Sequence, residues 1–418
     1  MSGSGPVRLG LRENAAQFAL LVAVNAFVGA MVGLERSTLP LIGKDDFGLS
    51  SSAAVLSFIV AFGLAKSFTN LAAGGLAERA GRRRLLLLGW AIALPVPLLV
   101  GVAPNWGWIV AANVLLGVNQ GLTWSMTVVM KIDLVGPRRR GLALGLNESA
   151  GYGGVALAAG VSGWLAADLA ARDVLVAGAA LVALAGLLLS AFFVRDTAGH
   201  VELEQEEIGG GLAEPASTLR SCAQAGLVNN MNDALAWGVV PLFLVAGGAS
   251  AAQVGLVAGL YPAVWGAGQI WTGHLSDRLG RKPLIVGGML VQAAALGLLA
   301  ASDAAVAVAA VAAVLLGAGT ALVYPTLIAA VSDAVAPAAR APVVGVYRFW
   351  RDMGYVAGGL LAGVVADSLD LAGAIAVIAG ITAASGLLVA VEMPGGLGLS
   401  PQSGSRQPGR SPAAARER

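Results

Sequence analysis

The chain has 418 residues, of which 57% are hydrophobic and 12% charged, with a formal net charge of +2. A soluble globular protein carries about 25% charged residues, so this composition excludes that class and predicts a membrane protein. The small net charge says little about partners, and we expect no nucleic-acid partner. The single cysteine, Cys222, excludes an internal disulfide.

Twelve apolar segments are long enough to cross a bilayer, which takes roughly 18 residues or more in a helix. The residues before the first segment are polar, so we expect no cleavable signal peptide. The segments lie near 16–36, 52–76, 85–103, 106–130, 141–166, 174–194, 222–246, 252–275, 284–301, 304–330, 342–366 and 371–391.

A polar, acidic connection at residues 195–220 separates the sixth and seventh segments. We interpret it as a solvated cytoplasmic tether between two halves, residues 1–194 and 221–393. A regulatory or partner-binding segment is the alternative. Residues 394–418 are rich in Gly, Pro, Ser and Arg, a composition that predicts a disordered cytoplasmic tail.

The two halves repeat one another in sequence. The string GGLAERAGRRR at residues 74–84 returns as GHLSDRLGRKP at residues 273–283, each time between two apolar segments. Further identical residues recur 200 positions apart, namely Gly117 and Gly317, Asp133 and Asp333, Arg140 and Arg340, and Gly145 and Gly345. Two parallel six-helix repeats joined by a linker are a known plan for transporters.

Most of the 26 Lys and Arg residues lie on one side of the predicted spans. The positive-inside rule places that side in the cytoplasm. We therefore predict a multi-pass protein of the cell (inner) membrane with both termini in the cytoplasm.

The repeated strings resemble the loop signature of the major facilitator superfamily, GxLADRxGRK, which follows the second and eighth helices in that family. With twelve spans in matching halves, the resemblance covers about residues 15–392. It implies an all-α membrane fold of two pseudo-symmetric six-helix bundles, acting as a monomer on a small molecule. One departure is Glu78, which stands where the family pattern has Asp.

In this family the signature loop forms a charged latch that closes the cytoplasmic side when the transporter faces outward. Charges at helix ends pair in one state and separate in the other. The latch residues that the resemblance implies are Glu78, Arg79, Arg82, Asp133, Arg140, Asp277, Arg278, Arg281, Asp333 and Arg340.

Six ionisable residues fall inside predicted spans, where each costs a few kcal/mol and is a functional hypothesis. In the functional interpretation the basic residues receive an anionic group of the substrate, and an acidic residue carries a proton. A static salt-bridge network that fixes helix packing is the alternative. The basic residues are Lys66, Arg348 and Arg351, and the proton-coupling candidates are Glu148, Asp233 and Asp352.

The repeat aligns Glu148 with Arg348 across the two halves. Arg348 and Asp352 are four residues apart, a spacing at which they neutralise each other on one helix. The alternative hypothesis is that Glu148 pairs with Arg348 or Arg351. The predicted cavity residues are Asn25, Lys66, Asn70, Asn229, Asp233, Trp265, Gln269, Tyr324, Arg348 and Arg351.

We predict a secondary transporter that works by alternating access and exports a small organic compound in exchange for protons. Proton-coupled exporters of this family often carry an arginine three residues before a Gln-Gly pair, but here Gly117 precedes Gln120. One alternative is a transporter, either an exporter or an importer, of a small organic or inorganic anion bound by Lys66, Arg348 and Arg351. Another is a non-transporting membrane receptor or scaffold. We find no catalytic, metal-ligand or nucleotide-binding pattern, and expect no enzyme, metal or cofactor.

Overall fold

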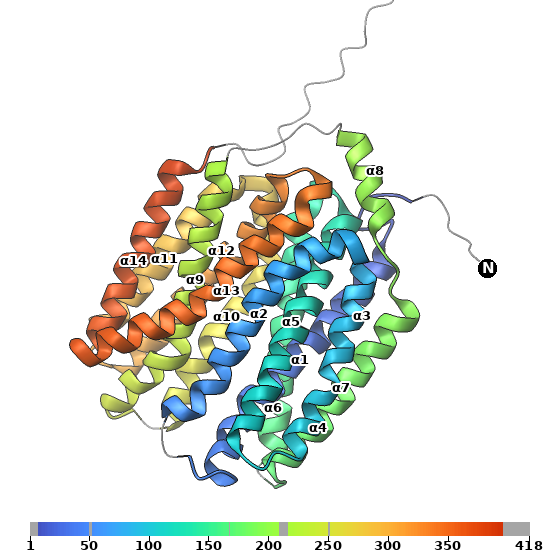
Figure 1. The fold of residues 1–418 in the computed structure, drawn as a ribbon. Helices are drawn as coiled ribbons and strands as arrows, with labels where there is room; N and C mark the ends of the chain where they lie inside the picture. The colour runs from blue at the N-terminus through green and yellow to red at the C-terminus, as the bar shows by residue number, and fades with distance from the viewer. Residues whose placement is uncertain (1–6, 50–51, 167, 209–215, 250, 396–418) are drawn as a thin grey trace, which may run out of the picture.

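Helices make up the part of the chain that the structure describes. In the computed structural model, the described residues form helices and no strand. Figure 1 shows the first half, in blue and green, beside the second half, in yellow to red. Most of the predicted tail, residues 396–418, lies outside the described residues. The residues that the structure describes are 7–49, 52–166, 168–208, 216–249 and 251–395.

The first half contains six spans, of which the third is interrupted. The interruption falls at Leu94, because Pro95 has no amide hydrogen with which to continue the helix. Leu94 keeps helical dihedral angles, so both pieces form a single span. The elements are α1 (Ala15–Asp45), α2 (Ser52–Ala80), α3 (Arg82–Ala93), α4 (Pro95–Gly101), α5 (Trp106–Val135), η1 (Pro137–Arg139), α6 (Arg140–Leu165) and α7 (Ala171–Phe193).

The second half repeats this order without the interruption. The repeated strings make the same turn, since Gly81 has φ 85° and Gly280 has φ 87°. Only glycine adopts such a positive φ without a steric cost, which explains why both strings carry it there. The elements are α9 (Ala216–Ala246), α10 (Ala251–Leu279), α11 (Arg281–Ala300), α12 (Val306–Asp333), η2 (Pro337–Ala339), α13 (Arg340–Ser368) and α14 (Leu371–Glu392).

Hydropathy divides the twelve spans into two groups. Seven spans of the described chain are apolar enough to cross a membrane by length and composition alone. The other five, α5, α6, α9, α10 and α13, are as long but less apolar, because they carry buried polar side chains. Such residues in a membrane protein face the interior of the bundle. Examples are Lys131, Glu148, Asp233, Gln269 and Arg348.

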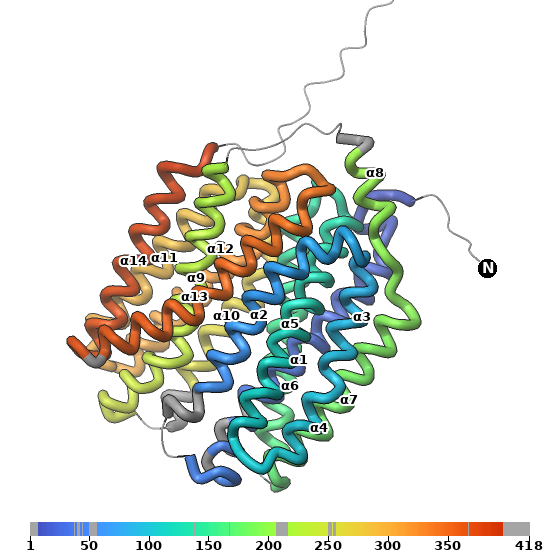
Figure 2. Tube along the Cα trace, in the orientation of Figure 1, coloured from blue at the N-terminus to red at the C-terminus, as the bar shows by residue number. Residues whose placement is uncertain are grey.

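Glycine residues allow the halves to touch along two helix pairs, α2 with α13 and α6 with α10. A Cβ atom at Gly141 would lie 2.3 Å from the carbonyl oxygen of Gly273, and one at Gly74 would lie 2.5 Å from that of Ala341. Such close backbone approach is typical of small residues between membrane helices. Figure 2 shows α2 and α13 side by side where the halves meet.

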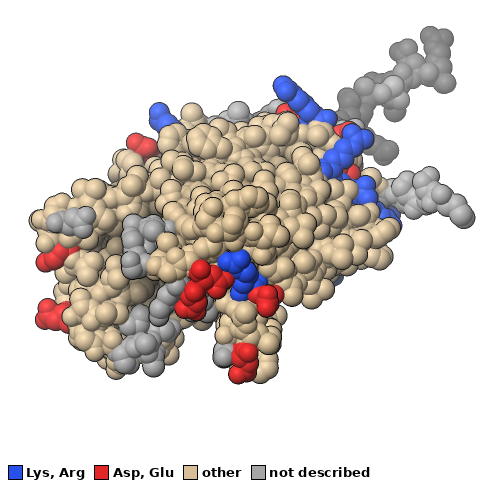
Figure 3. All heavy atoms as spheres, turned by 60° about the horizontal axis from the view of Figure 1, so that its bottom comes forward, with Lys and Arg blue, Asp and Glu red and all other residues tan. Residues whose placement is uncertain are grey.

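Both glycine contacts lie toward the end of the bundle where α3, α6, α11 and α13 begin. We call this the basic end, because Arg82, Arg140, Arg281 and Arg340 start those helices. Figure 3 is turned toward the opposite end, where few Lys or Arg side chains are visible. The described chain therefore carries its basic residues mainly at one end.

The connection between the halves contains a helix, α8 (Ala198–Ile208), at the basic end (Figure 1). Our interpretation of this segment as a solvated tether was wrong for its first part, since Val201 and Glu204 are buried. Polar contacts at the start of the segment hold it against the first half, where Asp196 accepts a hydrogen bond from the Arg83 amide at 2.9 Å. Residues 209–215 lie outside the described part.

Candidate functional site

A buried carboxylate, that of Asp352, joins the halves midway along the contact between α2 and α13. Asn70 Nδ2 donates a hydrogen bond to Asp352 Oδ2 at 2.6 Å, and Lys66 Nζ lies 3.9 Å from the same oxygen. The other oxygen pairs with Arg351 Nη2 at 2.5 Å. Ser125 Oγ in turn donates to Asn70 Oδ1 at 2.6 Å. Residues of the first half therefore hold an acid of the second.

The predicted pairing within α13 differs from the observed one. Asp352 pairs with its neighbour Arg351 rather than with Arg348, although the latter is one turn away. Glu148 forms no ion pair with either arginine in the described structure. Asp352 already has four polar partners, Asn70, Lys66, Arg351 and Asn230, so both of its oxygens are occupied.

The contact between α6 and α10 repeats this arrangement with different chemistry. Tyr152 and Trp265 have ring centroids 4.0 Å apart, and the repeat aligns them with Asp352 and Lys66. The sequence analysis missed Tyr152, although its alignment with Asp352 was a usable signal. Five aromatic side chains pack together here, with centroid distances of 4.0 to 6.0 Å. They are Trp124, Tyr152, Tyr261, Trp265 and Tyr324.

Basic side chains lie against this aromatic cluster. Lys66 Nζ is 5.4 Å from the centre of the Trp124 ring, and Arg351 Cζ is 5.0 Å from that of Tyr324. Cations attract the faces of aromatic rings at such distances. The Tyr152 hydroxyl donates a hydrogen bond to that of Tyr324 at 3.4 Å. The charged and aromatic contacts thus form one central site between the halves.

Glu148 is buried beside this site without a cationic partner. Its Oε1 accepts hydrogen bonds from Trp124 Nε1 at 3.1 Å and from Asn147 Nδ2 at 2.7 Å. Its Oε2 has no partner in the described structure. The Lys131 amine donates to the Asn147 side chain instead of pairing with the carboxylate directly. Glu148 is therefore an acid held by neutral donors.

Arg348 is fully buried, at 0% exposure, and all three of its guanidinium nitrogens lack a hydrogen-bond partner in the described structure. A buried polar group without a partner costs free energy, and a buried charge costs more. Trp265 Nε1 and both amide atoms of Gln269 are likewise buried and without partners. These unsatisfied groups belong to α10 and α13, on the two cross-half contacts.

Asp233 on α9 accepts hydrogen bonds from two tyrosines. Tyr261 donates to one carboxylate oxygen and Tyr355 to the other, the latter at 3.2 Å. Tyr355 also stacks on Trp237 at a centroid distance of 6.0 Å, and Arg36 lies 4.0 Å above the Trp237 ring. Arg36 belongs to α1, so this chain of contacts joins the halves toward the end opposite the basic end.

Two predicted cavity residues make their hydrogen bonds inside the halves. Asn25 Nδ2 donates to the Asn147 carbonyl at 2.7 Å, and its Oδ1 accepts from Thr127 at 2.9 Å. Asn229 Oδ1 accepts from Gln292 Nε2 at 3.0 Å. The structure therefore places Asn25 and Asn229 in the packing of their own bundles.

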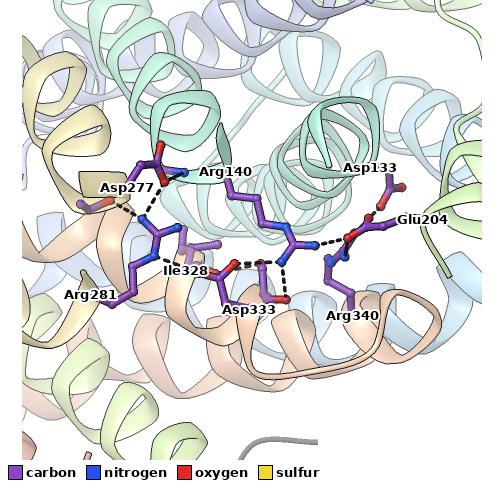
Figure 4. A network of polar contacts seen from close by, with 11 residues as sticks. Asp133, Arg140, Glu204, Asp277, Arg281, Ile328, Asp333 and Arg340 are labelled. Atoms are coloured by element: carbon purple, nitrogen blue, oxygen red, sulfur yellow. Dashed lines mark hydrogen bonds and ion pairs between the residues drawn. The ribbon is translucent and has the colours of Figure 1, made fainter. Parts of the chain in front are cut away.

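At the basic end, acids and arginines of the two halves form a continuous ion-pair network (Figure 4). Each half contributes one acid at the end of its fourth span, Asp133 or Asp333, and each acid pairs with one arginine of its own half and one of the other. The pairs are Arg82–Asp133 at 3.2 Å, Arg340–Asp133 at 3.3 Å, Arg140–Asp333 at 2.8 Å, Arg281–Asp333 at 2.9 Å and Arg281–Asp277 at 2.8 Å.

The two copies of the repeated string differ in their contact with the facing helix. Asp277 accepts hydrogen bonds from the amides of Gly141 and Leu142, both at 3.0 Å, and so caps α6. Glu78 makes no equivalent cap, because the residue aligned with Leu142 is Pro342, which has no amide hydrogen. Three of the implied latch residues are exposed without an ion pair in the described structure, namely Glu78, Arg79 and Arg278.

The network includes Glu204 of α8, which the sequence analysis did not single out. Its Oε1 accepts hydrogen bonds from Arg140 and from Arg340, the latter at 2.8 Å. These arginines belong to different halves. Thr197, just before α8, donates to Asp133 at 2.8 Å. No repeat pattern pointed to Glu204, since the connection has no counterpart in the other half.

Two helical bundles enclose a buried polar centre and meet through ion pairs, an arrangement typical of a membrane transporter. No group of three or more His, Cys, Asp or Glu in the described chain is arranged to hold a metal ion. The chain belongs to the Major Facilitator Superfamily, whose family model matches residues 17–221 and again 222–416. Members of this family are transporters of small molecules in membranes, not enzymes.

Curated relatives are the multidrug resistance proteins MdtG of Citrobacter koseri and of Enterobacter lignolyticus. Each is 25% identical over 279 residues, which cover 63% of this chain and 67% or 65% of the relative. The chain thus matches about two thirds of their length.

Solved structures with the same fold include the human organic anion transporter MFSD10, with a TM-score of 0.72, 17% identity, and coverage of 89% of this chain and 99% of that one. The proton:xylose symporter XylE has a TM-score of 0.75, 14% identity, and coverage of 91% and 97%. The fucose transporter FucP in its outward conformation has a TM-score of 0.71, 14% identity, and coverage of 91% and 99%. These likenesses establish the fold.

Proposed function

We propose that the chain is a monomeric secondary transporter that exports a small organic compound in exchange for protons. The observation that carries this proposal is the buried central site, which combines charged and aromatic side chains contributed by both halves. The multidrug resistance proteins among its relatives support export of organic compounds.

The basic end is the cytoplasmic end in this proposal, since basic residues remain on the inner side of the membrane. Both termini then lie in the cytoplasm. The ion-pair network closes the path from the cytoplasm to the central site. Separating Arg140 from Asp333 and Arg340 from Asp133 opens it, because these pairs join the two halves. Alternating access follows from rocking of the halves about the site.

Glu148 and Asp233 are the proton carriers that we propose. Each is buried and accepts hydrogen bonds from neutral donors without an ion pair in the described structure. Asp352 is the weaker candidate, because its ion pairs with Arg351 and Lys66 favour the charged form. Protonation of a carboxyl group lowers the cost of leaving it in a dry site, and so changes which conformation is favoured.

Transport into inside-out proteoliposomes with an acidic interior tests this proposal. A panel of radiolabelled organic cations, neutral compounds and anions is offered, and accumulation against a gradient is measured. We expect Glu148→Gln to lose accumulation driven by the pH gradient but to keep substrate exchange, which needs no net proton movement. The matched control is Asp46→Asn, because Asp46 is an exposed acid at the opposite end, paired with Arg172.

Two results would count against the proposal. If no compound of the panel accumulates in vesicles that contain folded protein, export of organic compounds is wrong. If Glu148→Gln and Asp233→Asn both keep full gradient-driven accumulation, proton coupling through these carboxylates is wrong.

A further inference from the structure

We infer that the substrate is an organic anion with an aromatic body, whose acidic group binds Arg348 and whose ring packs among Trp265, Tyr152 and Tyr324. This inference rests on the proposed transport function and names the class of substrate. Four observations lead to it. They concern the missing partner of Arg348, the unsatisfied hydrogen-bond donors, the charge of the central site and the arrangement of its aromatic rings.

The first observation is that Arg348 is the buried cation at the centre that makes neither a hydrogen bond nor an ion pair in the described structure. Lys66 and Arg351 both pair with Asp352, and Lys131 donates to Asn147. Arg348 makes no hydrogen bond through any of its nitrogens in the described structure. A guanidinium binds a carboxylate through two parallel hydrogen bonds, so an acidic ligand satisfies this group well.

The second observation is that unsatisfied donors outnumber unsatisfied acceptors at the centre, where Arg348 itself contributes three donor nitrogens. Trp265 Nε1, Gln269 Nε2 and one nitrogen of Arg351 are buried donors without partners. The unsatisfied acceptors there are Gln269 Oε1, Glu148 Oε2 and Asn230 Oδ1. A ligand that fits must therefore accept more hydrogen bonds than it donates, as a carboxylate does.

The third observation is the charge of the centre. The charges of Glu148, Asp352 and Arg351 all act on the Arg348 guanidinium. When all groups are ionised, five cations and four acids lie buried or half-buried within the spans, away from the ion-pair network of the basic end, which leaves one positive charge over (5 − 4 = 1). One monovalent anion neutralises it. The cations are Arg36, Lys66, Lys131, Arg348 and Arg351, and the acids are Glu35, Glu148, Asp233 and Asp352.

The fourth observation is the aromatic cluster, which gives the site a shape. Trp265 packs at 4.0 Å from Tyr152, at 5.2 Å from Tyr324 and at 5.7 Å from Tyr261, measured between ring centroids. Aromatic rings prefer stacked or edge-to-face contacts with other rings. The rings belong to α6, α10 and α12 of both halves, so a planar ligand body that packs against this cluster contacts both bundles.

Calorimetric titration of the purified protein with three matched probes tests the inference. Phenylacetate carries both the ring and the charge, phenylacetamide lacks the charge, and cyclohexylacetate lacks the aromatic ring. We expect phenylacetate to bind at least about tenfold more tightly than the amide, because only the carboxylate gives Arg348 an opposite charge and two parallel hydrogen bonds. We expect it to bind about two- to tenfold more tightly than cyclohexylacetate, because the latter cannot stack.

Substitution of Arg348 gives a second readout. Arg348→Gln should abolish the preference for the acid over the amide and also raise the thermal stability of the ligand-free protein, because it removes an unpaired buried charge. Arg351→Gln should lower that stability, because it takes the nearest cation from Asp352. Arg195→Gln, at an exposed position of the basic end, is the control and should leave both properties unchanged.

The outcomes separate this inference from the proposed function. If the three probes bind equally or not at all, or if Arg348→Gln keeps the preference for the acid, the inference is wrong. It is also wrong if Arg348→Gln destabilises the ligand-free protein as Arg351→Gln does, because Arg348 is then part of the packing. If organic cations accumulate and no acid binds, the inference is wrong, whereas the transport proposal is still supported.

Discussion

Replacing Glu204 by Gln tests whether α8 takes part in closing the basic end. The Glu204 carboxylate is fully buried and accepts hydrogen bonds from Arg140 of α6 and Arg340 of α13. It is therefore an acid from the connection placed between arginines of opposite halves. Glutamine has nearly the same shape and keeps one acceptor oxygen, so the change removes the charge and little else.

The free energy that the closed basic end loses depends on the partners that the two arginines keep. Arg140 still pairs with Asp333 and Arg340 still pairs with Asp133, so neither guanidinium is left alone. The loss is the charged part of two buried hydrogen bonds, about 2 kcal/mol in total rather than the 3–5 kcal/mol of a fully broken buried pair. A change of about 2 kcal/mol shifts the ratio of closed to open basic ends by about 30-fold.

The assay is a distance distribution between spin labels, one on each half. Cys222 is the single cysteine, so Cys222→Ser gives a cysteine-free background. Arg79→Cys and Arg278→Cys place labels near the ends of α2 and α10, at exposed positions without ion pairs in the described structure. We expect Glu204→Gln to enlarge the long-distance population.

Glu202→Gln is the matched control, because Glu202 is an exposed acid on the same helix. It should leave the distribution unchanged. A distribution for Glu204→Gln that matches the wild type, in protein where Arg340→Gln does enlarge the long-distance population, would refute the role of α8. The network would then act without the connection.

Three further predictions use the same labels or thermal unfolding. Asp277→Asn should enlarge the long-distance population, because it weakens a helix cap worth about 1 kcal/mol, whereas Glu78→Gln, at an exposed position, should change nothing. Gly141→Ala should prevent closure of the basic end, because its methyl group would lie 2.3 Å from a backbone carbonyl. Gly153→Ala has open space and should change neither the label distances nor the thermal unfolding. Burial lowers the pKa of the His200 imidazole on α8. Docking of α8 therefore favours the neutral ring and should weaken as the pH falls from about 7.5 to 5.5, an effect that His200→Gln should remove.

The sequence was sufficient for the spans and for the turns between them, because both depend on local chemistry. Apolar length identifies a membrane helix, and a glycine with positive φ marks the turn at Gly81 and again at Gly280. The family resemblance named Asp133 and Arg340 as latch residues but not as partners, and the pair that they form joins the two halves. These features recur in both halves, so each was visible twice.

The partners of buried charges were less predictable, because helix packing decides which of several nearby groups meet. Spacing on one helix favoured Arg348 as the partner of Asp352, yet Asn70 and Lys66 from the facing helix occupy one oxygen and Arg351 the other. Such contacts depend on how closely α2 and α13 approach. The glycines that permit this approach were recognisable in the sequence, but which residues of the two helices then lie opposite each other was not.

The central site differs between its two sides at positions that the repeat aligns. Lys66 and Asp352 form a charged contact between α2 and α13, whereas Trp265 and Tyr152 form an aromatic contact between α10 and α6. The backbone plan is the same on both sides, so the difference lies in the side chains alone. A symmetric site would hold a ligand equally well in two orientations. With charge on one side and rings on the other, this site favours a single orientation, and a bound ligand then contacts both halves through different chemistry as they move.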